Sequence, residues 1–124
     1  MNHDAMLAEM RGLREQITGV TGTVVAAVDG LLVAADTGDG IDPHSLAAVA
    51  AAGLGIARRT VTVADQGALD QAVAYCSRGY TAVYALGDLA LMVVLGDEGL
   101  DIGRLHSDSQ PTLDRIGSIL IEGE

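Results

Sequence analysis

The sequence contains no lysine, no phenylalanine, no tryptophan and only one cysteine. Without lysine, the chain lacks the side chain on which Walker-type phosphate loops, protein kinases and Schiff-base enzymes depend. Lysine and arginine together number seven, against seventeen acidic residues, which gives a formal net charge of −10 at pH 7. That charge excludes the basic surface that binds nucleic acid, and it argues against docking on an anionic membrane.

The lone cysteine, Cys76, cannot form an internal disulfide, which agrees with a reducing compartment. The N-terminus carries Asp4 and Glu9 where a signal peptide has basic residues and then an apolar run. The longest uncharged apolar stretch, residues 45–57, is shorter than the ~17–25 residues of a membrane-spanning helix. We therefore expect a cytoplasmic protein without direct membrane insertion.

Three tyrosines are the only aromatic residues, so alanine, valine, leucine and isoleucine must build the core. At 124 residues the chain has the length of a single domain, which we place at residues 1–124. Apolar residues make up 49% of the chain, whereas a domain of this size buries only ~60–70% of its unfolded surface. We therefore expect a second copy of the chain to cover part of the apolar surface.

Apolar spacing predicts an alternation of helices and strands. Met6, Met10 and Leu13 recur at helical intervals, and Asp42 followed by Pro43 is typical of a helix start. Apolar runs bounded by glycine are typical of strands. In chain order the expected elements are a helix at 5–17, strands at 23–28 and 31–35, a helix at 43–60, strands at 70–76, 80–86 and 89–95, and a final helical segment at 102–121.

The connections refine this pattern. Asp29-Gly30 between two apolar runs predicts a β-hairpin with a type I′ turn. Pro111 interrupts the last helical segment and Ser109 could cap a second piece, which predicts a kinked or broken helix. The strands are apolar on nearly every residue, so both sheet faces must be covered. The predicted fold is mixed α/β (α+β), a three-layer α/β/α sandwich around a five-stranded antiparallel sheet, in the order helix, two strands, helix, three strands, helix.

No group of side chains has the spacing of a metal site. A zinc site needs closely spaced histidine and cysteine ligands, and a calcium loop needs oxygen ligands at alternate positions. The histidines are scattered, and the acids near the second helix lie three residues apart, which suits a turn and a helix cap. The residues considered are His3, His44 and His106, and Asp36, Asp39 and Asp42.

Nor does any group have the pattern of a catalytic site. Cys76 has no histidine nearby and follows apolar residues, so we interpret it as a small buried residue. Segment 96–103 follows a strand and precedes a helix, as a phosphate loop does, but its three acids would repel phosphate. His106 could form a surface pair with Asp108. We expect no enzymatic activity and no cofactor.

Arg58 and Arg59 are the one cationic doublet in this acidic chain. One interpretation is an arginine supplied in trans to a GTPase, and the other is favourable charge at the C-terminal end of a helix dipole. The sequence favours the second interpretation, which needs no partner.

A series of short motifs runs through the chain. They are GTVVAAVDGLLVAA at Gly22–Ala35, the Ala-rich second helix, Gln71-Ala72-Val73-Ala74, Gly79-Tyr80, Ala85-Leu86-Gly87-Asp88, Leu91–Leu95 and Leu100-Asp101-Ile102-Gly103. In order and spacing they resemble the roadblock family, the dynein light-chain type of domain, in its bacterial branch of small-GTPase regulators. The resemblance extends from about Leu7 to Leu120, and Pro111 departs from the unbroken last helix of the family.

The resemblance implies a homodimer, in which two five-stranded sheets join at the third strand and the second helices pack side by side. The residue pattern agrees, because a helix that is apolar on most sides needs two neighbours and an end strand has free hydrogen-bonding groups. The dimer-interface candidates are Leu46, Val49, Ala50, Gly53 and Leu54 on the helix, and Gln71, Val73 and Tyr75 on the strand.

The resemblance also implies a function. Members of the family are non-catalytic platforms for Ras-like GTPases, which stimulate hydrolysis, aid exchange or act as scaffolds, and bacterial members often accompany an operon-linked sensor kinase-like protein. We therefore expect a homodimeric binding module for a small GTPase, with Arg58 and Arg59 as partner-binding candidates. The alternatives are a self-associating structural or signalling adaptor with a non-GTPase partner, and an enzyme acting on a small ligand.

Overall fold

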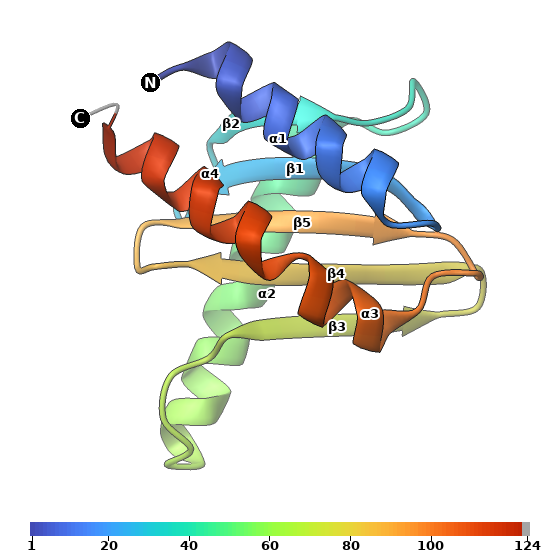
Figure 1. Ribbon diagram of the computed structural model, residues 1–124. Coiled ribbons are helices and arrows are strands. Elements are labelled where there is room, and N and C mark those ends of the chain that lie inside the picture. Colours follow the sequence, from blue (N-terminus) through green and yellow to red (C-terminus); the bar gives the residue numbers. More distant parts are fainter. Residues whose placement is uncertain (123–124) are drawn as a thin grey trace.

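The computed structural model describes residues 1–122 and places one antiparallel sheet between two layers of helices (Figure 1). Helix α2 covers one face of the sheet, and α1, α3 and α4 lie over the other. The predicted three-layer sandwich is confirmed. The elements are α1 (His3–Gln16), β1 (Val20–Ala27), β2 (Leu32–Asp36), α2 (Pro43–Val63), β3 (Gln71–Cys76), β4 (Gly79–Leu86), β5 (Ala90–Gly96), α3 (Ile102–Asp108) and α4 (Gln110–Glu122).

The five strands lie in the order β2-β1-β5-β4-β3, and all neighbours are antiparallel. Strand β5 is therefore central, and β3 ends the sheet on one side, as the meander predicted. An edge strand has a row of backbone N–H and C=O groups that no neighbour in the same sheet pairs. This leaves β3 available to pair with another chain.

Side chains of successive strand residues point to opposite faces, which produces two cores. Val93 belongs to the cluster under α2, whereas its neighbours Met92 and Val94 belong to the cluster under α1, α3 and α4. All three are fully buried. The uniformly apolar strands are therefore explained by a helix layer on each face.

The hairpin between β1 and β2 forms at the predicted position, but its turn differs from the expected type I′. Only Gly30 has a positive φ, of 93°, whereas a type I′ turn requires positive φ at both central residues. The Gly30 N–H donates to the carbonyl of Ala27, and the Asp29 side chain accepts from the Leu31 N–H at 3.1 Å. Four residues, 28–31, thus connect the two strands, and Gly30 takes the left-handed position within this connection.

The last helical segment is broken, as Pro111 predicts. Helix α3 ends at the cap residue Ser109, whose N–H donates to the Leu105 carbonyl, and α4 begins at the next residue. Pro111 lies in the first turn of α4, where its missing N–H leaves no helical hydrogen bond unmade. Arg115 of α4 forms an ion pair with Glu9 of α1, which joins the two helices.

Helix α2 begins as predicted and ends later than predicted. The Asp42 carboxylate accepts from the His44 N–H at 3.0 Å and from the Ser45 hydroxyl at 2.7 Å. The hydrogen bond from Ser45 is the main cause that holds the pKa of Asp42 below its usual value. The helix continues to Val63, and by length and composition it is apolar enough to cross a membrane. Four of its residues are buried against the sheet, and these are Ala47, Ala50, Ala51 and Leu54.

Candidate functional site

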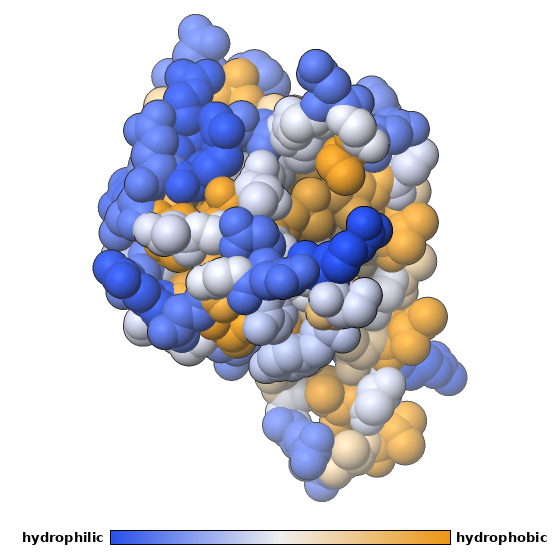
Figure 2. Space-filling model, turned by 90° about the vertical axis from the view of Figure 1, so that its right-hand side faces the viewer, coloured by the Kyte–Doolittle hydropathy of each residue, from blue (hydrophilic) through white to orange (hydrophobic). Residues whose placement is uncertain are grey.

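An exposed apolar stripe runs along α2 on the side away from the sheet. Val49, Ile56 and Val63 are 71%, 70% and 82% exposed. They are seven residues apart, about two helical turns, so all three lie on one side of the helix. Figure 2 shows apolar residues along this side of the molecule, down to the projecting end of α2. Exposed apolar residues that are contiguous in this way mark an interaction surface.

Small residues lie within the same stripe. Gly53 is exposed between Val49 and Ile56, and apart from its chain neighbours and the nearby backbone of α2 no described atom lies within 4 Å of the position where its Cβ would be. A glycine on a helix surface lets another backbone approach closely. The stripe can therefore accommodate a second helix at short distance.

Strand β3 lies beside this helix and exposes its outer edge. Figure 1 shows that the C-terminal end of α2 extends past β3. Gln71 and Val73 are half-buried on the α4 face of the strand, and Tyr75 is 73% exposed, with its ring 5.5 Å from that of Tyr80. Of the three expected interface residues of β3, Tyr75 is thus exposed, whereas Gln71 and Val73 are partly covered by the chain itself.

The α2 candidates divide between two sides of the helix. Val49 and Gly53 lie on the exposed side, whereas Ala50 and Leu54 are buried against the chain's own sheet and Leu46 is half-buried there. The prediction that all five face a second copy is wrong for Ala50 and Leu54. Apolar residues surround this helix, so periodicity could not indicate which side its own sheet would cover.

The two arginines also differ in their surroundings. The Nη2 atom of Arg58 donates to the Gly87 carbonyl at 2.9 Å, which holds this half-buried side chain against the turn between β4 and β5. Arg59 is exposed and lines a shallow hollow of about 320 Å³ together with Ile56, Thr60 and Val63. Because α2 continues to Val63, neither arginine lies in its last turn. The prediction that the two arginines stabilise the C-terminal end of the helix dipole is therefore wrong.

The sequence of residues 6–96 matches the family model of the Roadblock/LC7 domain. The chain belongs to the Roadblock/LC7 family. An uncharacterized protein of Methanocaldococcus jannaschii is 29% identical over 98 residues, which are 79% of this chain and 85% of that protein. A Roadblock/LC7 domain from Streptomyces avermitilis has a TM-score of 0.83 at 22% identity and covers 92% of this chain and 96% of its own. Myxococcus xanthus MglB has a TM-score of 0.90 at 14% identity, over 98% of this chain and 99% of its own.

In this Roadblock/LC7 domain the remaining candidate ligands stay apart. Within residues 1–122 no group of three or more His, Cys, Asp or Glu side chains could hold a metal ion. In the glycine-rich segment 96–103, Asp97 accepts from the Gly99 N–H at 2.8 Å, and Asp101 accepts from the Arg104 N–H at 3.1 Å. Asp97 therefore serves a turn and Asp101 a helix cap.

Cys76 and His106 lie in surroundings that the sequence did not predict. Cys76 is exposed on the edge strand, not buried, because β3 has no further strand beside it. Nδ1 of His106 is 2.6 Å from the Tyr84 hydroxyl, and Asp108 pairs instead with Arg104 at 3.1 Å. The pairing of His106 with Asp108 is thus wrong. Tyr84 and His106 are 22 residues apart in sequence, and no local pattern connects them.

Proposed function

We propose that this Roadblock/LC7 domain is a non-catalytic homodimeric module that regulates or tethers a Ras-like small GTPase. The observation that carries the proposal is the exposed stripe of Val49, Ile56 and Val63 beside the open edge of β3. Together they form an apolar surface and a row of unpaired backbone groups on adjoining elements. The fold shared with MglB over nearly the whole chain supports the proposal.

In the proposed dimer the two β3 strands pair antiparallel about a two-fold axis, and the two α2 stripes pack against each other. Pairing satisfies the backbone groups of the edge, and packing removes the exposed valine and isoleucine side chains from water. A two-fold axis makes the same patch serve both subunits. An MglB structure with a tetrameric arrangement supports self-association in proteins of this fold.

The GTPase contact is proposed to include Arg59. Arg59 is exposed beside the apolar stripe, so in the proposed dimer it lies at the rim of the packed helices, whereas Arg58 is bonded to the Gly87 carbonyl. An exposed arginine among apolar side chains has the composition of an interface hot spot. An arginine supplied in trans can also stabilise the charge that develops during GTP hydrolysis.

The test captures partners from the native lysate on the immobilised full chain, in parallel with GDP and with a non-hydrolysable GTP analogue. Recovery of a small GTPase, more strongly in one nucleotide state, is the expected result. A nucleotide-insensitive partner, or only further copies of the chain, would contradict the GTPase proposal and favour the adaptor. Light scattering on the purified chain tests the dimer separately, and a monomer at micromolar concentration would contradict it.

The role of Arg59 is tested with the captured GTPase. Arg59→Ala should weaken capture or slow GTP turnover, whereas Arg11→Ala, an exposed arginine on α1, is the matched control and should leave both unchanged. Loss of capture without a change in turnover per complex assigns Arg59 to binding. Equal effects of the two substitutions would contradict a specific contact at Arg59.

A further inference from the structure

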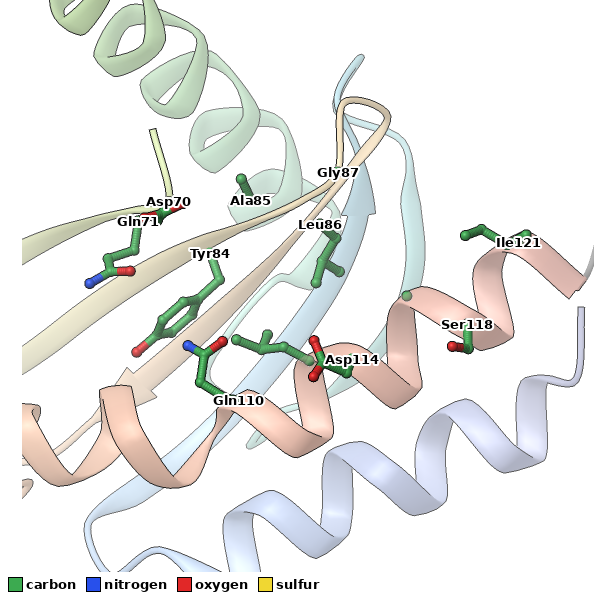
Figure 3. Close-up of a pocket in the computed structure, with 12 residues that line it drawn as sticks. Asp70, Gln71, Tyr84, Ala85, Leu86, Gly87, Gln110, Asp114, Ser118 and Ile121 are labelled. Atoms are coloured by element: carbon green, nitrogen blue, oxygen red, sulfur yellow. The ribbon is translucent and has the colours of Figure 1, made fainter. Parts of the chain in front are cut away.

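A groove lies between α4 and strands β3 and β4, on the face of the sheet opposite α2. Its volume is about 720 Å³. Figure 3 shows that Gln110, Asp114 and Ser118 of α4 form one wall, with Tyr84 and Leu86 of the sheet opposite them. The groove follows α4 from Gln110 to Ile121, a distance of about 16 Å at ~1.5 Å per helical residue.

The groove is acidic in its middle and apolar at one end. Asp70 and Asp114 line it, and its walls within residues 1–122 include no arginine or histidine. Arginines lie in the adjoining hollows, Arg58 in one that Asp70 also lines and Arg115 in one that Asp114 also lines. Neither carboxylate belongs to an ion pair within that part of the chain. Towards the turn between β4 and β5, an adjoining hollow of about 240 Å³ continues the groove, and the exposed Leu89 and Ile121 line it.

Gly117 lines both the groove and the adjoining hollow. It lies in the middle of α4, where glycine is a poor helix former. Apart from its chain neighbours and the nearby backbone of α4, no described atom lies within 4 Å of the position where its Cβ would be, so packing against other elements does not require a glycine there. A side chain at position 117 would project into the groove, and glycine keeps that space open.

We propose that this groove is the docking site for a basic, amphipathic helical segment of a partner protein. Basic side chains of the segment pair with Asp70 and Asp114, and an apolar side chain enters the hollow beside Leu89 and Ile121. The length of the groove matches about three helical turns. A second copy of this chain does not fit the charge, because it also carries −10 and has no lysine.

This site shares strand β3 with the proposed dimer, because Gln71 lines the groove and is also a dimer-interface candidate. The dimer would use the backbone edge of β3, whereas the groove uses side chains on its α4 face. The stripe of Val49, Ile56 and Val63 lies on the α2 face, and the groove opens on the α4 face. Both surfaces can therefore be occupied in one assembly, and the groove proposal does not depend on whether a GTPase binds. The chain would then connect two different proteins.

The probe is a synthetic amphipathic peptide of about three helical turns, with leucines on one side and lysines elsewhere. A matched peptide replaces each lysine with glutamate. Each is titrated into the ¹⁵N-labelled full chain, and amide chemical shifts are followed. The lysine peptide should bind and shift the amides of Asp70, Gln71 and the α4 residues Gln110 and 112–121, and the glutamate peptide should not.

Two variants test the location. Gly117→Leu fills the groove and should lower the affinity for the lysine peptide by about tenfold or more. Asp114→Asn should lower that affinity by a smaller factor. Gly12→Leu is the matched control, because Gly12 is also a helical glycine with open space around it, on α1. Gly12→Leu should bind the peptide as the unaltered chain does.

Four outcomes would overturn the proposal. They are no binding of the lysine peptide, equal binding of the glutamate peptide, equal effects of Gly117→Leu and Gly12→Leu, and shift changes spread over the whole acidic surface. The last outcome would assign the binding to general attraction by the net charge. If Gly117→Leu does not fold, as its amide spectrum would reveal, unchanged binding by Asp114→Asn combined with Asp70→Asn contradicts the proposal.

Discussion

The Tyr84 hydroxyl lies 2.6 Å from Nδ1 of His106 and joins the sheet to helix α3. The ring of Tyr84 is buried, and the two rings meet edge to face with their centroids 5.7 Å apart. Burial raises the pKa of Tyr84 above its ordinary value. The phenol is therefore kept neutral in the folded chain at a pH where an exposed tyrosine ionises.

We predict that this burial makes the fold sensitive to alkaline pH. The unfolded chain releases the Tyr84 proton near pH ~10, whereas the folded chain retains it to a higher pH. The folded state therefore binds more protons above that pH, and the free energy of unfolding decreases as the pH rises further. The measurement is urea denaturation between neutral pH and pH 11.

Tyr84→Phe should lower the free energy of unfolding by about 1 kcal/mol at neutral pH, because the hydrogen bond to His106 is lost. It should also reduce the alkaline loss of stability, because no phenol remains to ionise at this position. Tyr75→Phe is the control, since Tyr75 is exposed. An alkaline profile unchanged by Tyr84→Phe would be incompatible with the role given to Tyr84.

The division of α2 into a sheet side and a free side predicts that two truncations differ strongly in their effect on stability. Leu54→Ala removes a side chain buried against the sheet and should lower the free energy of unfolding by about 2–5 kcal/mol. Val49→Ala removes an exposed side chain and should change the stability of the monomer by less than about 0.5 kcal/mol. Chemical denaturation at a protein concentration below dimer dissociation measures both. Similar losses for the two variants would disagree with the orientation of α2.

A charge within the stripe should separate the subunits of the proposed dimer. Ile56→Asp places a carboxylate where the second helix is expected, so light scattering should report the mass of one chain, 12.7 kDa. Leu31→Asp is the matched control, because Leu31 is 68% exposed and lies on the β1–β2 turn, compared with 70% for Ile56. If both variants remain dimeric, the stripe is not the interface.

Alanine substitutions at two glycines, one within α1 and one in the turn after it, should change the free energy of unfolding in opposite directions. Gly12 lies in α1 with open space around it, so Gly12→Ala should raise the free energy of unfolding by about 0.5–1 kcal/mol. Gly19 has a φ of 98°, and a Cβ there would lie 2.8 Å from Cα of Leu100. Gly19→Ala should therefore lower the stability by more than about 1 kcal/mol. Thermal denaturation of the pair gives the comparison directly, and equal signs would contradict it.

Much of the fold follows from local patterns in the sequence. Two helices were predicted correctly, α1 from the helical spacing of its apolar residues and the start of α2 from Asp42-Pro43. Both signals depend on backbone geometry within a few residues. Pro111 predicted the break between α3 and α4 for the same reason. The type of the Asp29-Gly30 turn was missed, because Asp29 lacks the positive φ of a type I′ turn and its conformation depends on how β1 and β2 pair.

The candidate site was predictable only in part. The sequence indicated that α2 needed two neighbours and that β3 had a free edge, and both features are present. It did not separate Val49 from Leu54, or Arg59 from Arg58, since each pair has similar chemistry and the difference lies in which neighbour the side chain meets. Neither the contact between Tyr84 and His106 nor the groove along α4 has a local signal.

By itself the sequence determined the order of helices and strands, the apolar excess and the acidic charge of this Roadblock/LC7 domain. Hydrogen-bonded backbone geometry gives side chains a period of two residues in strands and 3.6 residues in helices, and a short stretch of sequence is enough to recognise either period. Only the tertiary structure decided which side of α2 its own sheet covers, and that Gly117 faces open space. Those outcomes depend on side chains that are distant in sequence and meet only when the layers pack, so no local period encodes them.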